Sequence, residues 1–310
     1  MRVLIISVFL GTIFFTGQFL LSVNLPLGLI MSSKIQSHEE KKVFSSWNPL
    51  IPQVGGVSTS NFSLSARSAL SYELTDEKMV FAKNINEKLP MASLTKIMTA
   101  YLALEEGIDK RYRVSSSAAL IGENVMGLSE GEILTLEELL YGLMLPSGND
   151  AAEVIAEGSP YGRDGFVEEM NKRAKQLGLG NTHFTNPSGL EGDGDQVTTV
   201  VDLLKLTKTA LENKNFLKVV STYEKELPNN NEHKYYRLFN DTNLLTSYPG
   251  VKGVKTGFTW EAGLCLVTYL EHNGHKIIAV ILNSQNRRQE MKDLLDYTLI
   301  ELGETPPKHE

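Results

Sequence analysis

Patterns typical of β-strands stand at both ends of this chain, and patterns typical of helices fill its middle. Near the start, residues 68–74 and 79–82 are predicted to form two short strands. Near the end, three further runs are predicted strands: residues 250–257, 262–271 and 275–283. Asn273-Gly274, between the last two, is a strong signal for a tight hairpin. These distant strands are expected to share one sheet, since each has an apolar face to bury.

The middle of the chain carries clear helix signals. Thr135 and Glu138 form a capping box, and Thr199 followed by Asp202 marks another helix start. The predicted helices cover residues 93–106, 135–146, 149–157, 166–177, 199–211 and 287–302. The order strands, helices, strands, helix therefore predicts an α+β fold with α/β/α-like layers. In this fold, an antiparallel sheet from both chain ends is flanked by helices.

Composition excludes several classes of protein. The chain has 310 residues, 42% of them hydrophobic and 22% charged, so it can bury a large core. Its net charge of -7, without a dense basic cluster, argues against nucleic-acid binding. Its one cysteine, Cys265, leaves no partner for an intramolecular disulfide or a cysteine zinc site. His272 and His275 flank the hairpin turn and are expected to be solvated, so no metal or cofactor is predicted.

The N-terminus predicts export. No charged residue lies between Arg2 and Lys34, and this apolar stretch is long enough to span a bilayer. We expect residues 1–33 to be an uncleaved membrane anchor, with a cleaved signal peptide as the alternative. Residues 34–64 are polar and predict a tether. Residues 65–303 would form the folded domain, and residues 304–310 a tail. The protein would then lie on the outer face of the cytoplasmic membrane, or would be secreted if the N-terminal segment is cleaved.

Three short motifs follow one another along the chain: Ser93-Leu94-Thr95-Lys96, Ser147-Gly148-Asn149 and Lys255-Thr256-Gly257. Each has an ordinary reading on its own, because a Ser-x-x-Lys match is expected about once by chance in a chain of this length. Asn149 could simply cap a helix, and the third motif could end a strand. Together they supply a nucleophilic hydroxyl, an amine, a second hydroxyl with an amide, and a cationic strand, which indicates acyl transfer through serine.

The chemistry of the first motif follows from its spacing. Ser93 and Lys96 are three residues apart, so a helix would place them on one face. A serine hydroxyl needs a base, and a free lysine with a pKa of ~10.4 is ~3 units too basic to serve near neutrality. Burial and a neighbouring positive charge, which Lys255 could supply, would lower the pKa of Lys96. A glycine such as Gly257 on an edge strand would let a ligand approach closely.

The motifs and their flanks resemble the low-molecular-weight penicillin-binding proteins, serine D-alanyl-D-alanine carboxypeptidases of the DacA/DacF type in peptidase family S11. The resemblance covers about residues 65–300 and implies a β-lactamase/transpeptidase-like fold. It rests on Arg287 and on four segments: Met91 to Ala100, Leu145 to Ala152, Asn186-Pro187-Ser188-Gly189-Leu190, and Gly253 to Thr259. It implies removal of the terminal D-alanine from peptidoglycan pentapeptides, inhibition by β-lactams, and a part in cell-wall biogenesis and cell shape. No obligate protein partner is evident.

The resemblance also implies a role for each matching residue. Ser93 would be the acylated nucleophile, Lys96 its base, and Ser147 and Asn149 would relay a proton and place the substrate. Lys255 and Thr256 would bind the terminal carboxylate beside Gly257, with Arg287 as a helper. The N–H groups of Ser93 and Phe258 would form the oxyanion hole.

Departures from the family pattern leave alternatives open. Phe258 stands where some relatives have histidine. The sequence also ends before the second domain and the C-terminal amphipathic helix that many relatives have. An N-terminal anchor would replace that helix. A D,D-endopeptidase of the same family is the first alternative. A class A-like β-lactamase should have aspartate where Gly148 stands, and a non-catalytic wall-binding protein would not need every catalytic position filled.

Overall fold

The computed structural model describes residues 46–50, 62–242 and 244–309. The predicted anchor, residues 1–33, and most of the predicted tether lie outside these residues. Within the described part of the chain, no helix combines the length and the apolar composition that crossing a membrane requires. The elements in chain order are β1 (Ser68–Glu73), β2 (Lys78–Lys83), β3 (Leu89–Pro90), η1 (Ala92–Thr95), α1 (Lys96–Ala103), η2 (Leu104–Glu106), β4 (Arg111–Arg113), α2 (Ser116–Ala119), β5 (Ile133–Thr135), α3 (Leu136–Met144), α4 (Asn149–Glu157), α5 (Gly162–Gln176), β6 (Val197–Thr198), α6 (Val200–Leu211), α7 (Lys214–Val220), β7 (Glu224–Leu227), β8 (Tyr236–Phe239), α8 (Leu244–Ser247), β9 (Val251–Thr259), β10 (Gly263–His272), β11 (His275–Ser284) and α9 (Arg287–Glu301).

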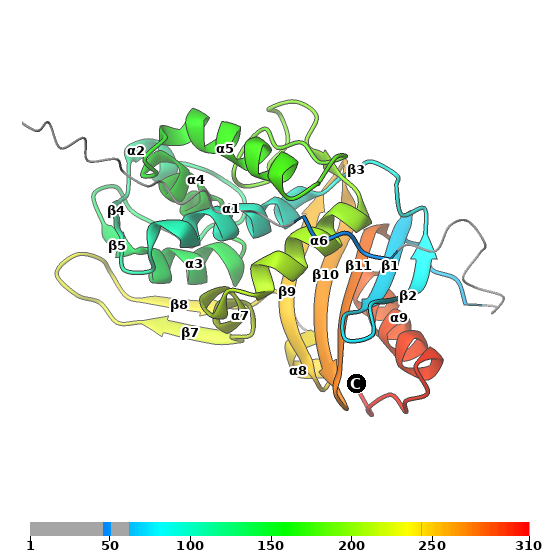
Figure 1. Cartoon of the computed structure of the whole chain (residues 1–310). Helices are drawn as coiled ribbons and strands as arrows, with labels where there is room; N and C mark the ends of the chain where they lie inside the picture. Colours follow the sequence, from blue (N-terminus) through cyan, green and yellow to red (C-terminus); the bar gives the residue numbers. More distant parts are fainter. Residues whose placement is uncertain (1–45, 51–61, 243, 310) are drawn as a thin grey trace, which may run out of the picture. The chain divides into compact units, whose positions relative to one another are not determined.

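The two ends of the chain meet in one antiparallel five-stranded sheet of order β2-β1-β11-β10-β9 (Figure 1). Strand β1 pairs with β11 from Ser68 opposite Leu282 to Glu73 opposite Ile277. Asn273 and Gly274 both have positive φ, as a tight hairpin turn requires, and join β10 to β11. The sequence prediction of a sheet shared by both ends is therefore confirmed.

Both faces of the sheet are buried, which explains the nearly continuous apolar run in β11. Ile278, Val280 and Leu282 pack into the core that includes α6. The alternate residues Ile277, Ala279 and Ile281 pack against α9 on the opposite face. Each isoleucine, valine or leucine among them contributes about 1.5–3 kcal/mol when fully buried, so the three-layer core fixes the position of the sheet.

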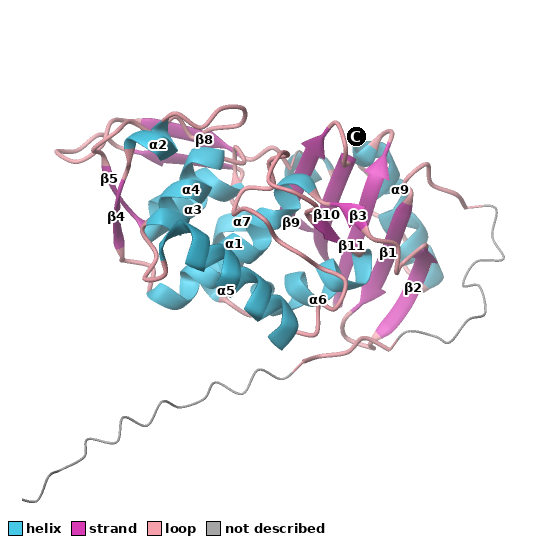
Figure 2. Ribbon diagram, turned by 90° about the horizontal axis from the view of Figure 1, so that it is seen from above, coloured by secondary structure: helices cyan, strands magenta, loops and turns pink. Residues whose placement is uncertain are grey.

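A second group of helices, α1 and α3 to α5, lies beyond strand β9, which forms one edge of the sheet (Figure 2). The predicted helix at residues 93–106 begins and ends as 3-10 turns, η1 and η2, around α1. Helix α5 starts at Gly162, earlier than predicted. The antiparallel strand pairs β4–β5 and β7–β8 and the short helices α2 and α7 were not predicted, because each element is short and has weak periodicity.

Candidate functional site

Ser93 lies in the 3-10 turn η1, which directly precedes helix α1. The preceding residue, Ala92, has a φ of 49°, a left-handed conformation that costs an L-residue about 1–3 kcal/mol. Gly189 packs closely on this turn, and a Cβ at that position would lie 2.0 Å from the carbonyl oxygen of Ala92. The surrounding structure thus holds the Ser93 turn in a strained geometry, while the Ser93 side chain remains partly accessible.

Lys96 is fully buried and contacts three polar groups. Its Nζ lies 2.7 Å from Asn149 Oδ1, 2.7 Å from the Ser188 carbonyl oxygen and 3.0 Å from Ser93 Oγ. Burial, and secondly the charge of Lys255, hold the pKa of Lys96 well below its usual value. This shift favours the uncharged amine, which is the form of lysine that can act as a base.

In its uncharged form, the amine has donors for only two of these three contacts. A neutral amine has two N–H donors and one lone pair. Asn149 Oδ1 and the Ser188 carbonyl can only accept, so they take both donors. In that form, the lone pair of Lys96 is left for the hydroxyl of Ser93, whose Oγ lies 3.0 Å away. This is the arrangement that a base needs before it removes a proton.

The second motif lies at the start of α4. Ser147 is buried with a φ of 65°, and its Oγ has no hydrogen-bond partner among the described residues. Asn149 binds Lys96 through Oδ1 and donates from Nδ2 to the Gly122 carbonyl. Asp150, which the sequence analysis did not single out, accepts three N–H groups from residues 126–128 at 2.8–2.9 Å. This carboxylate joins the loop between α2 and β5 to the start of α4.

The packing around Gly148 explains why aspartate does not stand there. A Cβ at position 148 would lie 2.7 Å from the Gly142 carbonyl oxygen and 2.9 Å from an Asp150 carboxylate oxygen. We expect Gly148→Asp to lower the free energy of unfolding by about 2 kcal/mol, through crowding and like-charge repulsion. Urea unfolding of the variant checks this. Gly180→Asp is the control, because a Cβ there meets nothing within 4 Å; equal stability of the two variants would contradict the packing explanation.

The third motif lies on edge strand β9, against the Ser93 turn. A Cβ at Gly257 would lie 3.0 Å from the Met91 carbonyl oxygen and 3.3 Å from Ser93 N, so a side chain at this position would crowd the Ser93 turn. The Lys255 side chain is buried, and burial lowers its pKa to about 7. Arg287, at the start of α9, donates to the Gly257 carbonyl at 2.7 Å. Thr256 is also buried, whereas Phe258 is about half exposed.

The loop of residues 186–190 is a part of the site whose function the sequence analysis did not predict. The Asn186–Leu190 segment was matched to the family, but no role was given to it from the residues. Asn186 Oδ1 accepts the N–H groups of Ser188 and Gly189, at 3.1 and 2.7 Å, and so turns the Ser188 carbonyl toward Lys96. Thr99 Oγ1 fastens the same loop by donating to the Pro187 carbonyl at 2.6 Å. The Asn-Pro-Ser-Gly sequence, a typical turn signal, was the available clue.

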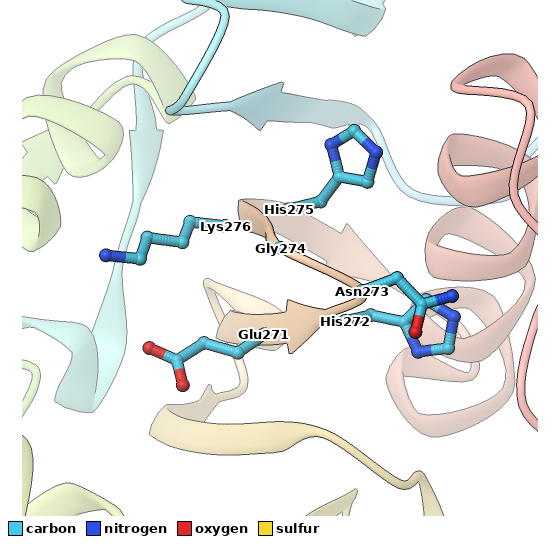
Figure 3. Close-up of a pocket in the computed structure, with 6 residues that line it drawn as sticks. All are labelled: Glu271, His272, Asn273, Gly274, His275 and Lys276. Carbon is cyan, nitrogen blue, oxygen red and sulfur yellow. The ribbon is translucent and has the colours of Figure 1, made fainter.

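Two other features lie at the opposite end of the sheet, at the β10–β11 hairpin. An open hollow of about 260 Å³ is lined by Glu271 to Lys276, and none of the predicted site residues is among them (Figure 3). Glu73, Asp76 and His275 place possible ligand atoms within 4.8 Å of one another there. Neither feature adjoins Ser93, whose partners lie near the other end of β10. Cys265 is buried in β10, as expected for a small apolar residue.

Comparisons with known proteins agree on one family. The profile of Peptidase_S11, described as D-alanyl-D-alanine carboxypeptidase, matches residues 56–286. D-alanyl-D-alanine carboxypeptidase DacF of Bacillus subtilis (strain 168) is 37% identical over 252 residues, which are 78% of this chain and 64% of that protein. A D-alanyl-D-alanine endopeptidase of Escherichia coli (strain K12) is 29% identical, over 84% of this chain and 86% of that protein.

A solved structure supports the same conclusion about the fold. The crystal structure of the Streptomyces K15 DD-transpeptidase superposes with a TM-score of 0.73 and 29% sequence identity. The match covers 78% of this chain and 99% of that chain. The predicted α+β architecture of the penicillin-binding type is therefore confirmed.

Proposed function

Since the chain belongs to the D-alanyl-D-alanine carboxypeptidase family of serine peptidases, we propose that it removes the terminal D-alanine from peptidoglycan pentapeptides. One observation carries the proposal. Ser93 Oγ lies 3.0 Å from the buried amine of Lys96, which also donates to Asn149 Oδ1 and to the Ser188 carbonyl oxygen. This geometry gives the serine a base without histidine.

The proposed reaction begins with binding of the terminal carboxylate by Lys255 and Thr256. Lys96 takes the Ser93 proton while Oγ bonds to the carbonyl carbon of the penultimate D-alanine. The N–H groups of Ser93 and Phe258 stabilise the negative charge that develops on the carbonyl oxygen. The C–N bond then breaks, and the proton passes from Lys96, with Ser147 as relay, to the departing amine of D-alanine.

Hydrolysis completes the proposed cycle. Water attacks the ester on Ser93, one proton returns to Oγ, and the shortened peptide leaves as a carboxylate. Asn149 keeps both Lys96 and the substrate in position throughout, and Arg287 keeps the Gly257 carbonyl and strand β9 in place. A β-lactam would acylate Ser93 in the same way, but its opened ring cannot leave the site, so the adduct would persist.

Labelling with a fluorescent penicillin followed by peptide mass spectrometry tests the proposal. We expect one adduct per chain, on the peptide that contains Ser93, and release of one D-alanine from a purified pentapeptide. An adduct on another peptide, or none, would refute the assignment of Ser93. Rapid turnover of nitrocefin would favour a β-lactamase instead, and absence of all reaction would favour a non-catalytic wall-binding protein.

One relative, from E. coli, is named as an endopeptidase, so carboxypeptidase activity should be distinguished from endopeptidase activity. Cross-linked muropeptide dimers and monomeric pentapeptides can be supplied at equal concentration and the products compared. Faster release of D-alanine from monomers is the expected result. Faster conversion of dimers to monomers would instead assign the chain to the endopeptidase alternative.

We also propose that the protein acts outside the cytoplasmic membrane, held there by residues 1–33. The support is the uncharged run between Arg2 and Lys34 and the extracytoplasmic substrate of the proposed reaction. Intact mass of the native protein and its extraction with detergent, but not with alkaline carbonate, would support an anchor. A mass lacking this segment would show cleavage.

A further inference from the structure

The turn between β9 and β10 is firmly held although it lies on the surface. Ala262 N donates to Thr259 Oγ1 at 3.1 Å, and Asn283 Nδ2 donates to the Ala262 carbonyl at 3.1 Å. From the loop that also positions Lys96, Glu191 Oε1 accepts the N–H of Glu261 at 2.8 Å. The backbone that carries residue 260 is therefore held in a defined position next to the site.

Residue 260 is a tryptophan with almost no cover. Trp260 is 91% exposed and Phe258 is 48% exposed, and their rings meet edge to face with centroids 5.7 Å apart. A paired, exposed aromatic surface on a braced turn has no role in the core, and such surfaces typically mark interaction sites. The pair directly follows Lys255-Thr256-Gly257 along the edge strand.

The charged groups at the turn itself are negative, whereas the cations Lys255 and Arg287 lie on the other side of Phe258, around Gly257. Glu191 and Glu261 are both exposed, and both lie at the turn that carries Trp260. Hydrogen bonds from the Thr259 hydroxyl and the Glu261 N–H lower the pKa of Glu191, so its carboxylate is ionised at neutral pH. Aromatic faces beside carboxylates provide the chemistry that attracts an ammonium group.

The direction of the bound peptide follows from the proposed function. If its terminal carboxylate lies at Lys255 and Thr256 and its reacting carbonyl lies at Ser93, the preceding residues run toward Trp260. An extended chain advances about 3.3 Å per residue, so position 260 lies about 7 Å beyond Phe258. The residue before the reacting D-alanine, with a long side chain, can reach that distance.

We propose that Phe258, Trp260 and the two carboxylates form a subsite for the side-chain ammonium of a diamino acid, the residue that precedes the reacting D-alanine. This inference rests on the proposed carboxypeptidase function. It assigns the chemical class of the substrate side chain: a free primary amine is favoured over the same side chain capped as an amide.

Two peptides that differ only in one acetyl group test the subsite. We would measure kcat/KM for Nα-acetyl-L-Lys-D-Ala-D-Ala and for its Nε-acetylated form. The unmodified enzyme is expected to prefer the free amine by about five- to tenfold, and less so at high ionic strength. Trp260→Ala is expected to reduce the ratio to below twofold, and Glu261→Gln to reduce it partly. Tyr161→Ala removes another exposed aromatic and should leave the ratio unchanged.

The outcomes separate this subsite from the reaction itself. Equal kcat/KM for the two peptides, with normal penicillin labelling, would overturn the subsite alone. A preference that persists in Trp260→Ala would also overturn it. If neither peptide is hydrolysed and Ser93 is not labelled by penicillin, the proposed function fails as well.

Discussion

Replacing Lys96 with methionine is expected to slow the acylation of Ser93 by on the order of a thousandfold. The amine of Lys96 is the basic group hydrogen-bonded to Ser93 Oγ, and methionine of similar length offers no proton acceptor of comparable strength. The measurement is the rate of labelling by fluorescent penicillin in the two proteins. Labelling within threefold of the unmodified rate would show that another group removes the proton.

Chemical rescue distinguishes a missing base from a distorted site. Lys96→Ala would leave a cavity lined by Asn149 Oδ1 and the Ser188 carbonyl, which can bind a small amine. Added methylamine should then restore part of the labelling rate, in proportion to its unprotonated fraction. A variant that melts normally but is not rescued would argue that the Lys96 chain itself positions Ser93.

The sequence allowed prediction where the signal was local or periodic. The capping box of Thr135 and Glu138 is present at α3, and Thr199 accepts the Asp202 N–H at the start of α6, because a cap involves neighbouring residues only. The hairpin at Asn273 follows from the backbone preferences of its own two residues. The shared sheet followed from the runs of apolar residues in both chain ends.

The parts that escaped prediction depend on contacts between distant segments. The Ser188 carbonyl that holds Lys96 is a backbone group, and every residue has one, so composition carries no sign of it. The left-handed conformation of Ala92 is imposed by packing, since alanine itself disfavours it. The anchoring of loop 126–128 by Asp150 depends likewise on tertiary structure. The site residues could be predicted from the motifs, but their hydrogen-bond partners could be identified only from the three-dimensional structure.

Replacing Lys255 with methionine is expected to stabilise the fold while impairing the proposed reaction. Burial lowers the pKa of Lys255 to about 7, so below pH 7 the folded protein carries a charge that is better solvated in the unfolded chain. The difference from the ordinary value corresponds to about 5 kcal/mol of lost stability below pH 7. Methionine avoids this cost, so Lys255→Met should unfold at higher urea concentration at pH 6.

The pH dependence gives the prediction its sign. Between pH 7 and about 10.4, the unfolded chain binds more protons at this position than the folded one, so the stability of the unmodified protein rises with pH. The advantage of Lys255→Met should therefore shrink by about 4 kcal/mol from pH 6 to pH 10. The control is Lys252→Met, an exposed lysine on the same strand, for which we expect no such trend. A constant difference across this range would contradict the burial effect.

The same variant links stability to function, because the charge that destabilises the fold has two proposed uses. Lys255 would bind the terminal carboxylate, so KM for the peptide should rise in Lys255→Met. Its charge also helps to lower the pKa of Lys96, so the rise of the acylation rate with pH should shift to higher pH in the variant. If the variant is more stable but has an unchanged KM and an unshifted pH profile, Lys255 takes no part in the reaction. Its burial would then have no catalytic explanation.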